Sequence, residues 1–425
     1  MEWQVATAAV IFLLVYAIII SEKIHRTVIA LAGAVLVIIL GIITQEQAVQ
    51  AIDFNTIGLL TGMMIVVGIT RRSGVFEYVA IRAAQYTKGN PLKIMVALCV
   101  ITALASAFLD NVTTVLLLVP VTFSLCDELE INPIPFLIAE IMASNIGGTA
   151  TLIGDPPNIM IGGGAGLGFM DFVTNLTPVI LVVFVVTIVL LAIIFRKSLV
   201  VTLEKQQRIM VFEPADFIKD YALLKKSLTV IVLVIIGFIL HQSLHLESAT
   251  VALAGAALLM LIARDNKPED ILLTVEWPTI FFFIGLFILV GSLEKVGIIE
   301  NIARETLSLT HGNQSVTAMA ILWMSAIASA FVDNIPFTAT MIPLIKSVGQ
   351  LSGMQLDPLW WSLSLGACLG GNGTLIGASA NLVVAGMSSR RGVIITFMQY
   401  FRYGFPLMLV SIVISTAYIY LRYLM

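Results

Sequence analysis

The stretches "ASAFLDNVTT" (residues 105–114) and "ASAFVDNIPF" (residues 328–337) each place an Asp-Asn pair inside a long apolar run. Asp110 in the first stretch and Asp333 in the second are 223 residues apart. A charged side chain at membrane depth is costly and usually has a function. The recurrence of the pair in the same apolar setting therefore indicates a duplicated chain with a polar site in each copy.

Composition defines the solvent in which the chain folds. Of its 425 residues, 59% are hydrophobic and 12% are charged, whereas charged residues make up about a quarter of an ordinary soluble domain. Too few charges are present to cover a globule in water, so we expect a polytopic protein of the cell inner (plasma) membrane, in contact with the lipid bilayer. The net charge of −3 gives no reason to expect nucleic acid as a partner. The three cysteines are widely spaced and predict neither a disulfide framework nor a metal site.

Apolar runs long enough to span a bilayer alternate with interrupted ones. The uninterrupted candidates are 3–20, 27–44, 56–70, 171–195, 227–242, 248–264, 278–293 and 398–421. Polar tips interrupt 92–124 and 315–346, and glycine-rich sequence interrupts the spans 134–166 and 358–387. Lys and Arg in the short loops place the linker 196–226 in the cytoplasm. That orientation holds only if 92–124 and 315–346 each enter and leave on one side, as re-entrant hairpins.

The two halves of the chain align at a constant offset. "GGTATLIGDPPN" (147–158) matches "GGNGTLIGASAN" (370–381), again 223 residues later. Five full spans per half is an odd number, so the second copy is inverted relative to the first. We therefore expect an all-α membrane protein of two inverted repeats, 1–195 and 227–425. Each repeat would have about five spans plus a re-entrant hairpin, and the broken helices would meet at the midplane. Inverted repeats with broken helices are typical of alternating-access transporters.

The hairpin tips and broken spans supply the candidate binding groups. Helix breaks at membrane depth are tolerated where they line a cavity, and they expose helix N-termini and free carbonyls to a solute. The side chains predicted to bind the substrate are Asp110, Asn111, Thr113, Thr114, Asn145, Thr149, Thr151, Asn158, Asp333, Asn334, Thr338, Asn372, Thr374, Ser379 and Asn381. Amides, hydroxyls and carboxylates of this kind suit a small hydroxylated neutral solute, a cation, or a small anion held by helix ends.

Carboxylates without cationic neighbours indicate a coupling ion. The hairpin tips and broken spans contain Asp110, Glu140, Asp155 and Asp333, and no Lys, Arg or His. A receptor for a multivalent anion normally includes a guanidinium, whereas lone buried carboxylates suit proton or Na⁺ binding. We therefore expect these four residues to bind the coupling proton or Na⁺, with no other cofactor. Asp155 and Glu140 have Ala378 and Leu363 as their repeat partners, a broken symmetry that marks either coupling residues or drift.

Four long motifs carry a family resemblance over essentially the whole chain. "SAFLDNVTTVLLLVPVT", "IAEIMASNIGGTATLIGDPPNIMIG", "ASAFVDNIPFTATMIPLI" and "GGNGTLIGASANLVVAG" resemble the permeases of the ion transporter superfamily. The branch they resemble holds the arsenite efflux permease ArsB and the pink-eyed-dilution P protein. The resemblance implies a scaffold plus transport arrangement, elevator-like movement, and homodimers in part of the superfamily. The dicarboxylate branch has Ser-Asn-Thr at its hairpin tips, and the Asp-Asn-Val-Thr and Asp-Asn-Ile-Pro found here count against a dicarboxylate.

The leading functional prediction is proton-coupled efflux of a small inorganic solute, arsenite or antimonite as the neutral hydroxide. A Na⁺/H⁺ antiporter and a small-anion permease of the P-protein kind remain open. Cys368 is a candidate metalloid contact, although one thiol is not the three-sulfur cage that such an element prefers. No nucleophile–base pair or metal cluster predicts an enzyme. The sequence leaves open whether a soluble ATPase docks on the cytoplasmic face.

Overall fold

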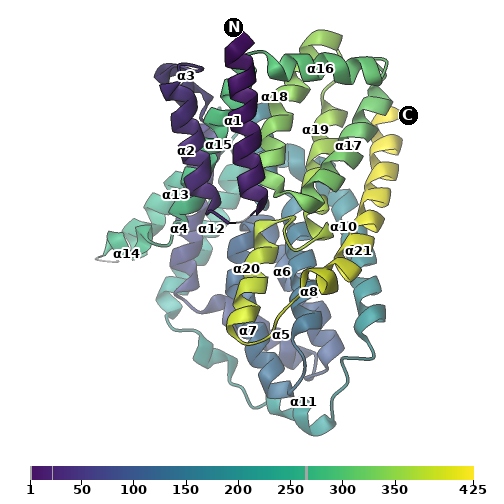
Figure 1. Cartoon of the computed structure of the whole chain (residues 1–425). Coiled ribbons are helices and arrows are strands. Elements are labelled where there is room, and N and C mark those ends of the chain that lie inside the picture. Colours follow the sequence, from purple (N-terminus) through teal and green to yellow (C-terminus); the bar gives the residue numbers. More distant parts are fainter. Residues whose placement is uncertain (1, 22, 264–266) are drawn as a thin grey trace.

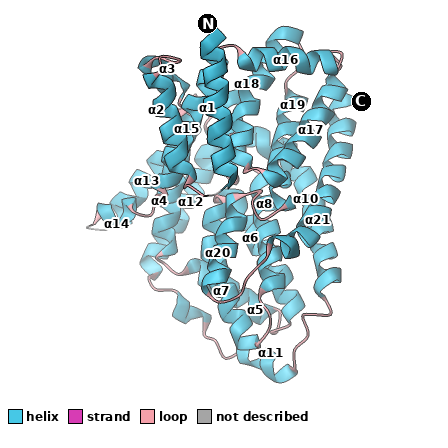
Figure 2. Ribbon diagram, in the orientation of Figure 1, coloured by secondary structure: helices cyan, strands magenta, loops and turns pink. Residues whose placement is uncertain are grey.

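The computed structural model describes residues 2–21, 23–263 and 267–425. Within these ranges all regular structure is helical and no strand is present (Figure 2). The molecule is a long bundle whose two termini lie at one end, and α11 of the linker lies at the other (Figure 1). We refer to these ends as the terminal face and the linker face. The last residue of the predicted span 248–264 lies outside the described residues.

The helices of the two halves follow in the same order. The first half contains α1 Glu2–Ser21, α2 Arg26–Ile39, α3 Gln45–Ala51, α4 Phe54–Arg71, α5 Val75–Tyr86, α6 Pro91–Phe108, α7 Asn111–Leu129, α8 Ile134–Thr149, α9 Pro156–Ala165 and α10 Phe169–Phe195. The linker contains α11 Leu203–Ile209 and the 3₁₀ turn η1 Pro214–Phe217. The second half contains α12 Tyr221–Leu240, α13 Ser248–Ala263, α14 Pro268–Leu272, α15 Trp277–Lys295, α16 Ile298–Leu309, α17 Gln314–Phe331, α18 Asn334–Ser352, α19 Asp357–Gly370, the 3₁₀ turn η2 Gly371–Gly373, α20 Ser379–Arg390, α21 Phe397–Ile419 and the π-helical turn η3 Tyr420–Leu424.

Long apolar helices account for most of the bundle. Among the described residues, eight helices are long and apolar enough to cross a membrane, and four shorter apolar helices accompany them. The long ones are α1, α4, α7, α10, α12, α15, α17 and the α21–η3 segment. Large apolar side chains on α1 and α12 remain exposed, among them Leu13, Leu14 and Leu233. Such exposure in water would be a liability, so it confirms the prediction of an all-α polytopic membrane protein.

Each predicted hairpin is a pair of helices joined at its polar tip. α6 ends at Phe108 and α7 begins at Asn111, and between them Leu109 and Asp110 are extended. The Asp110 carboxylate accepts the backbone N–H of Thr113 at 2.9 Å and thereby caps α7. Asp333 caps α18 in the same way, accepting the N–H of Ile335 at 3.0 Å. The tip aspartates therefore begin the second helix of each hairpin, a local reason for their presence in both copies.

Helices of opposite halves pack together through glycine. α4 packs on α13 and α15 packs on α2, and with α1 and α12 these six helices form what we call the cross-repeat bundle. A Cβ atom at Gly62 of α4 would lie 2.6 Å from the Ala252 backbone, and one at Gly285 of α15 would lie 2.7 Å from the Ala30 backbone. Only glycine permits helices to approach so closely. The contact of α4 with α13 and its repeat equivalent, α15 with α2, thus both depend on a glycine that faces an alanine backbone.

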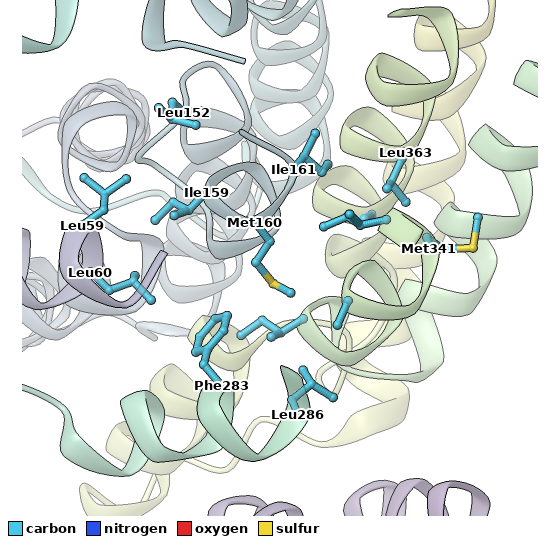
Figure 3. Close-up of a cluster of buried hydrophobic side chains, with 14 of the residues drawn as sticks. Leu59, Leu60, Leu152, Ile159, Met160, Ile161, Phe283, Leu286, Met341 and Leu363 are labelled. Carbon is cyan, nitrogen blue, oxygen red and sulfur yellow. The ribbon is translucent and has the colours of Figure 1, made fainter. Parts of the chain in front are cut away.

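The broken spans pack against the hairpins of their own half. A Cβ atom at Gly147 of α8 would lie 2.2 Å from the carbonyl oxygen of Ala103 on α6, and one at Gly370 of α19 would lie 2.6 Å from that of Ala326 on α17. Between these helices and the cross-repeat bundle lies an apolar core, shown in part in Figure 3, where Leu60, Met160 and Phe283 are labelled. This core joins α4, α9 and α15.

The linker is attached to the first half by ion pairs. Glu130, at the end of α7, accepts hydrogen bonds from Lys205 Nζ and Arg208 Nη1 of α11, both at 2.8 Å. The side-chain nitrogen of Gln85 donates to the carbonyl oxygen of Phe212 at 2.6 Å, and the Lys219 N–H donates to the Ser73 carbonyl at 2.9 Å. These contacts place the linker beside the ends of α4, α5 and α7.

We predict that Gly285→Ala lowers the free energy of unfolding by about 1–3 kcal/mol, because its new methyl group has no space against the Ala30 backbone. Gly386→Ala is the matched control, since a Cβ atom at Gly386 meets nothing within 4 Å and alanine favours a helix by up to about 1 kcal/mol. Melting curves of the purified variants in detergent measure the difference. Equal melting temperatures would contradict the close approach of α15 and α2.

A second prediction concerns the linker and pH. The hydrogen bonds from Lys205 and Arg208 hold the pKa of Glu130 below its usual range. Because the folded-state pKa is lowered, the contact stabilises the linker fully above the unfolded value of about 4.3, and this stabilisation is lost as the pH falls through the lower folded value. We expect faster hydrogen exchange in 203–209 at acidic pH, after correction for intrinsic rates. Glu130→Gln should show the fast rate already at neutral pH, whereas Glu128→Gln should behave like the wild type.

Candidate functional site

The two hairpin tips meet at one buried carboxylate. Asp155 lies in the break between α8 and α9 and is 0% exposed. Its Oδ1 accepts the side-chain amide of Asn111, from the first hairpin, at 3.2 Å and that of Asn334, from the second hairpin, at 3.5 Å. Its Oδ2 is buried and has no hydrogen-bond partner among the described residues. One oxygen of Asp155 thus connects the tips, and the other makes no hydrogen bond to the described residues.

Asn145 links the same tip to the second break. Its Oδ1 accepts from Asn111 at 3.1 Å, and its Nδ2 donates to the side-chain oxygens of Asn372 and Asn381, both at 2.9 Å. All four asparagines are buried. Asn372 Nδ2 is buried without a partner among the described residues, whereas the paired amide groups of a buried network hold one another rigidly. The network therefore fixes the two breaks and the first hairpin relative to one another.

Asn158, and Asn381 of the same network, satisfy the broken backbone. Asn158 Nδ2 donates to the carbonyls of Thr149 and Thr151 at 3.1 and 2.9 Å. Its repeat mate Asn381 donates to the carbonyls of Gly371 and Thr374, both at 2.8 Å. Free carbonyls in an apolar interior would cost several kcal/mol each. The asparagines thus stabilise the breaks, and Thr151 and its mate Thr374 add hydroxyl bonds to the adjoining hairpins.

Cys368 occupies the position equivalent to Asn145 in the second repeat. Its Sγ lies 3.5 Å from Asn158 Oδ1, which also accepts the hydroxyl of Ser364 at 2.6 Å. The thiol therefore makes the repeat-related version of the bond from Asn145 to Asn381. It is fully buried, and no other cysteine accompanies it there, since Cys99 and Cys126 belong to a different apolar cluster.

Arg26 corrects an expectation from the sequence. The carboxylates of the tips were expected to have no cationic partner, but Arg26 Nη1 lies 2.6 Å from Asp333 Oδ2. The same nitrogen donates to Ser379 Oγ at 2.6 Å, and Ser379 Oγ donates to Asp333 Oδ2 at 3.0 Å. The guanidinium carbon lies 4.9 Å from the ring centroid of Phe282. The second tip is therefore bound to α2 by an ion pair, and the first tip has no equivalent pair among the described residues.

Three cavities adjoin this network. The smallest, about 20 Å³, is called the chamber here. Its polar lining is Arg26, Asp110, Asn111, Asp155, Glu276, Thr279, Asn334 and Ser379. A cavity of about 290 Å³ adjoins it on the side of Arg26 and Asp333, and another of about 310 Å³ lies on the side of Thr113 and Arg71. Asp110, Asp155 and Glu276 give the chamber more negative than positive groups, because Arg26 is its one cation and is already paired with Asp333.

Not every predicted residue reaches the chamber. Glu140 is buried in α8 and accepts the hydroxyl of Thr122 at 2.6 Å, among the side chains of the first half. Thr113 donates to Asp110 Oδ2, and the hydroxyls of Thr114 and Thr338 are buried without a partner in the described part of the chain. The sequence motifs did not predict Arg26 and Glu276 as site residues, although both line the chamber. A usable signal for Glu276 was its alignment with Asp53 at the repeat offset.

We predict that Arg26→Ala and Asp333→Asn are non-additive. Each removes the same partly buried contact, so the loss of unfolding free energy in the double variant should be about 0.5–3 kcal/mol smaller than the sum of the two single losses. Melting curves of the four proteins measure this coupling. The exposed pair of Arg304 and Glu300, 2.7 Å apart, is the control, because exposed pairs are worth about 0–1 kcal/mol. Strict additivity for Arg26 and Asp333 would contradict the ion pair.

Comparison with known proteins places the chain in a family. Residues 16–366 match the profile described as CitMHS, citrate transporter. The chain is 45% identical over 422 residues to a protein named an uncharacterized transporter in Mycobacterium tuberculosis (strain ATCC 25618 / H37Rv), with 98% of each chain covered. It is 43% identical over 423 residues to the 46 kDa membrane protein of Mycobacterium leprae (strain TN), again with 98% of each covered.

Two further similarities extend the comparison. The chain is 36% identical over 501 residues to the P protein of Homo sapiens, covering 98% of this chain but only 60% of the P protein. The YdaH transporter of Alcanivorax borkumensis has the same fold, with a TM-score of 0.59 at 14% identity, over 88% of this chain and 86% of that one. The predicted resemblance to the ion transporter superfamily is thereby confirmed. The chain is a multi-pass membrane transporter that belongs to the citrate transporter (CitMHS) family.

Proposed function

We propose that the protein is a proton-coupled secondary transporter in which Asp155 carries the coupling proton. The observation that carries this proposal is the buried Oδ2 of Asp155, which has no partner among the described residues. An ionised carboxylate is costly in a dry interior, and binding a proton removes that cost. Oδ1 meanwhile contacts amides from both hairpins. Binding of a proton to Asp155 would thus change its contacts with both hairpins, which border the solute.

We further propose arsenite or antimonite, as the neutral hydroxide, as the exported solute. The cavity of about 290 Å³ that adjoins the chamber has room for such a solute. Its polar lining is His25, Arg26, Glu276, Asp333 and Ser379, and the guanidinium of Arg26 is already paired with Asp333. A neutral polyhydroxyl solute there can use these donors and acceptors without electrostatic repulsion, whereas a free multivalent anion would be repelled by Glu276 whenever that side chain is ionised. Na⁺/H⁺ antiport fits the same negative charge, with Na⁺ at Asp155.

A carboxylate anion is the second candidate, because of Arg26. The Arg26 guanidinium lies beside Ser379 at the start of α20. A guanidinium next to a helix N-terminus suits an anion. The family description, citrate transporter, agrees with this alternative. For such a substrate Arg26 would have to exchange Asp333 for a carboxylate of the solute.

The deciding experiment uses proteoliposomes that contain a pH-sensitive dye. Arsenite, Na⁺ and citrate are added separately under an imposed proton gradient. We expect proton movement with arsenite, and we expect Asp155→Asn to reduce it to the rate of protein-free vesicles. Glu140→Gln is the matched control, because Glu140 is equally buried but lies outside the chamber, and it should retain proton movement. A response to Na⁺ alone or to citrate alone would replace arsenite with that solute, and full activity of Asp155→Asn would refute its coupling role.

A further inference from the structure

Glu276 is a carboxylate of the cross-repeat bundle to which no role has yet been given. It directly precedes α15 and lines all three cavities at the tips, of about 290, 20 and 310 Å³. Asp155, by contrast, lines only the smallest of these three cavities. Glu276 is therefore the acidic side chain that borders both the chamber and the two larger cavities.

Glu276 differs from its repeat mate in that it does not cap its helix. Asp53, 223 residues earlier, begins α4 and accepts the N–H groups of Asn55 and Thr56 at 2.9 and 3.3 Å and the Thr56 hydroxyl at 2.6 Å. Glu276 makes no such backbone cap at α15 and accepts the hydroxyl of Thr279 at 3.3 Å. The Glu276 carboxylate thus makes no hydrogen bond to the N-terminal N–H groups of α15 and lines the chamber instead.

The chamber has the size of a single water molecule. A cavity needs about 10–15 Å³ to hold one water, and the chamber measures about 20 Å³. Within its lining, the buried Oδ2 of Asp155 lacks a hydrogen-bond partner among the described residues. An unpartnered buried oxygen beside a water-sized space indicates a position where a proton can be delivered.

The cavity of about 310 Å³ extends from Glu276 toward the linker face. Its lining extends from Glu276 through Thr274 and Gly68 to Arg71, at the end of α4. That end of α4 adjoins the linker, where the Lys219 N–H donates to the Ser73 carbonyl. The charged or titratable groups that border the cavities of Glu276 are Arg26 and His25 from the start of α2, Arg71 from α4, Asp110 and Asp333 from the tips, and Asp155 from the break.

We propose that Glu276 is the port through which protons pass between the linker face and Asp155. This inference rests on the proposed coupling role of Asp155. The carboxyl O–H of Glu276 donates its proton to a water in the chamber, and that water gives a proton to Asp155 Oδ2. Glu276 then takes a proton from a hydronium ion that reaches the larger cavity from the linker face, which leaves water there, so that one proton has moved and the chamber water is unchanged. Asp53 borders a separate cavity of about 240 Å³ with Glu294 and Lys346, and it does not line the chamber.

The test varies the pH at one face at a time in vesicles of known orientation, established by protease cleavage of the linker. We expect Glu276→Gln to lose the dependence of dye-reported proton movement on pH at the linker face, while its dependence on pH at the terminal face is retained. Glu276→Asp, which keeps the carboxyl group, should recover part of the lost dependence. Asp53→Asn is the matched control and should keep the wild-type profile at the linker face. Melting temperatures of the purified variants report folding, separately from proton movement.

The outcomes separate this inference from the proposal on which it rests. If Glu276→Gln has the wild-type profile at the linker face while Asp155→Asn abolishes proton movement, the port is refuted and coupling at Asp155 stands. If Asp155→Asn moves protons normally, the coupling proposal itself fails. If Asp53→Asn alters the linker-face profile as much as Glu276→Gln does, a shared structural role replaces the port. Loss of linker-face dependence in Glu276→Gln alone supports it.

Discussion

A backbone that is broken inside an apolar bundle must satisfy its own polar groups, and the rest of this structure depends on how that is done. Asn158 and Asn381 each bridge two carbonyls of a break at 2.8–3.1 Å. Lipid offers no substitute for these bonds. Because the two amides complete the breaks, the intervening residues can be held outside α-helical conformation within the molecule. Asp155 is one of these residues, and its position between the hairpin tips follows from this backbone constraint.

The repeat supplies the framework, and its exceptions supply the chemistry. The glycine contacts of α4 and α15, the tip aspartates and the bridging asparagines occur in both halves. The groups at the centre of the site do not, since the carboxylate of Asp155 aligns with Ala378 and the amide of Asn145 aligns with the thiol of Cys368. A symmetric pair of acids at the centre would add two buried charges where one is already costly. A single acid in the breaks, Asp155, is contacted by amides from both hairpins and gives one group to which both halves respond.

Sequence reasoning reached the parts of this site that are encoded locally. The polar tips, the two glycine-rich breaks and their asparagines carry their signal in short contiguous motifs, and the structure brings most of them together. Glu140 belongs to the predicted set because it is a carboxylate in a broken span without a cation, and it precedes Asn145 by five residues in the same span. Five residues turn an α-helix by about 140° beyond a full turn, so the two side chains leave α8 on different faces, and Glu140 faces Thr122 instead. Arg26 and Glu276 come from the cross-repeat bundle, and their proximity to the tips depends on packing between helices that no motif describes.

The ion pair between Arg26 and Asp333 joins the cross-repeat bundle to the second hairpin tip. Any movement of that tip relative to α2 must break the pair, and breaking a partly buried ion pair by removing one partner is costly unless the charges find other partners. Glu276 borders the same cavity as Arg26. An ionised Glu276 carboxylate can form an ion pair with the Arg26 guanidinium, whereas a protonated Glu276 cannot. Proton movement through Glu276 would then decide whether Arg26 can release the tip. Under this argument, coupling needs no contact between the solute and the proton site, because both act on the same hairpin.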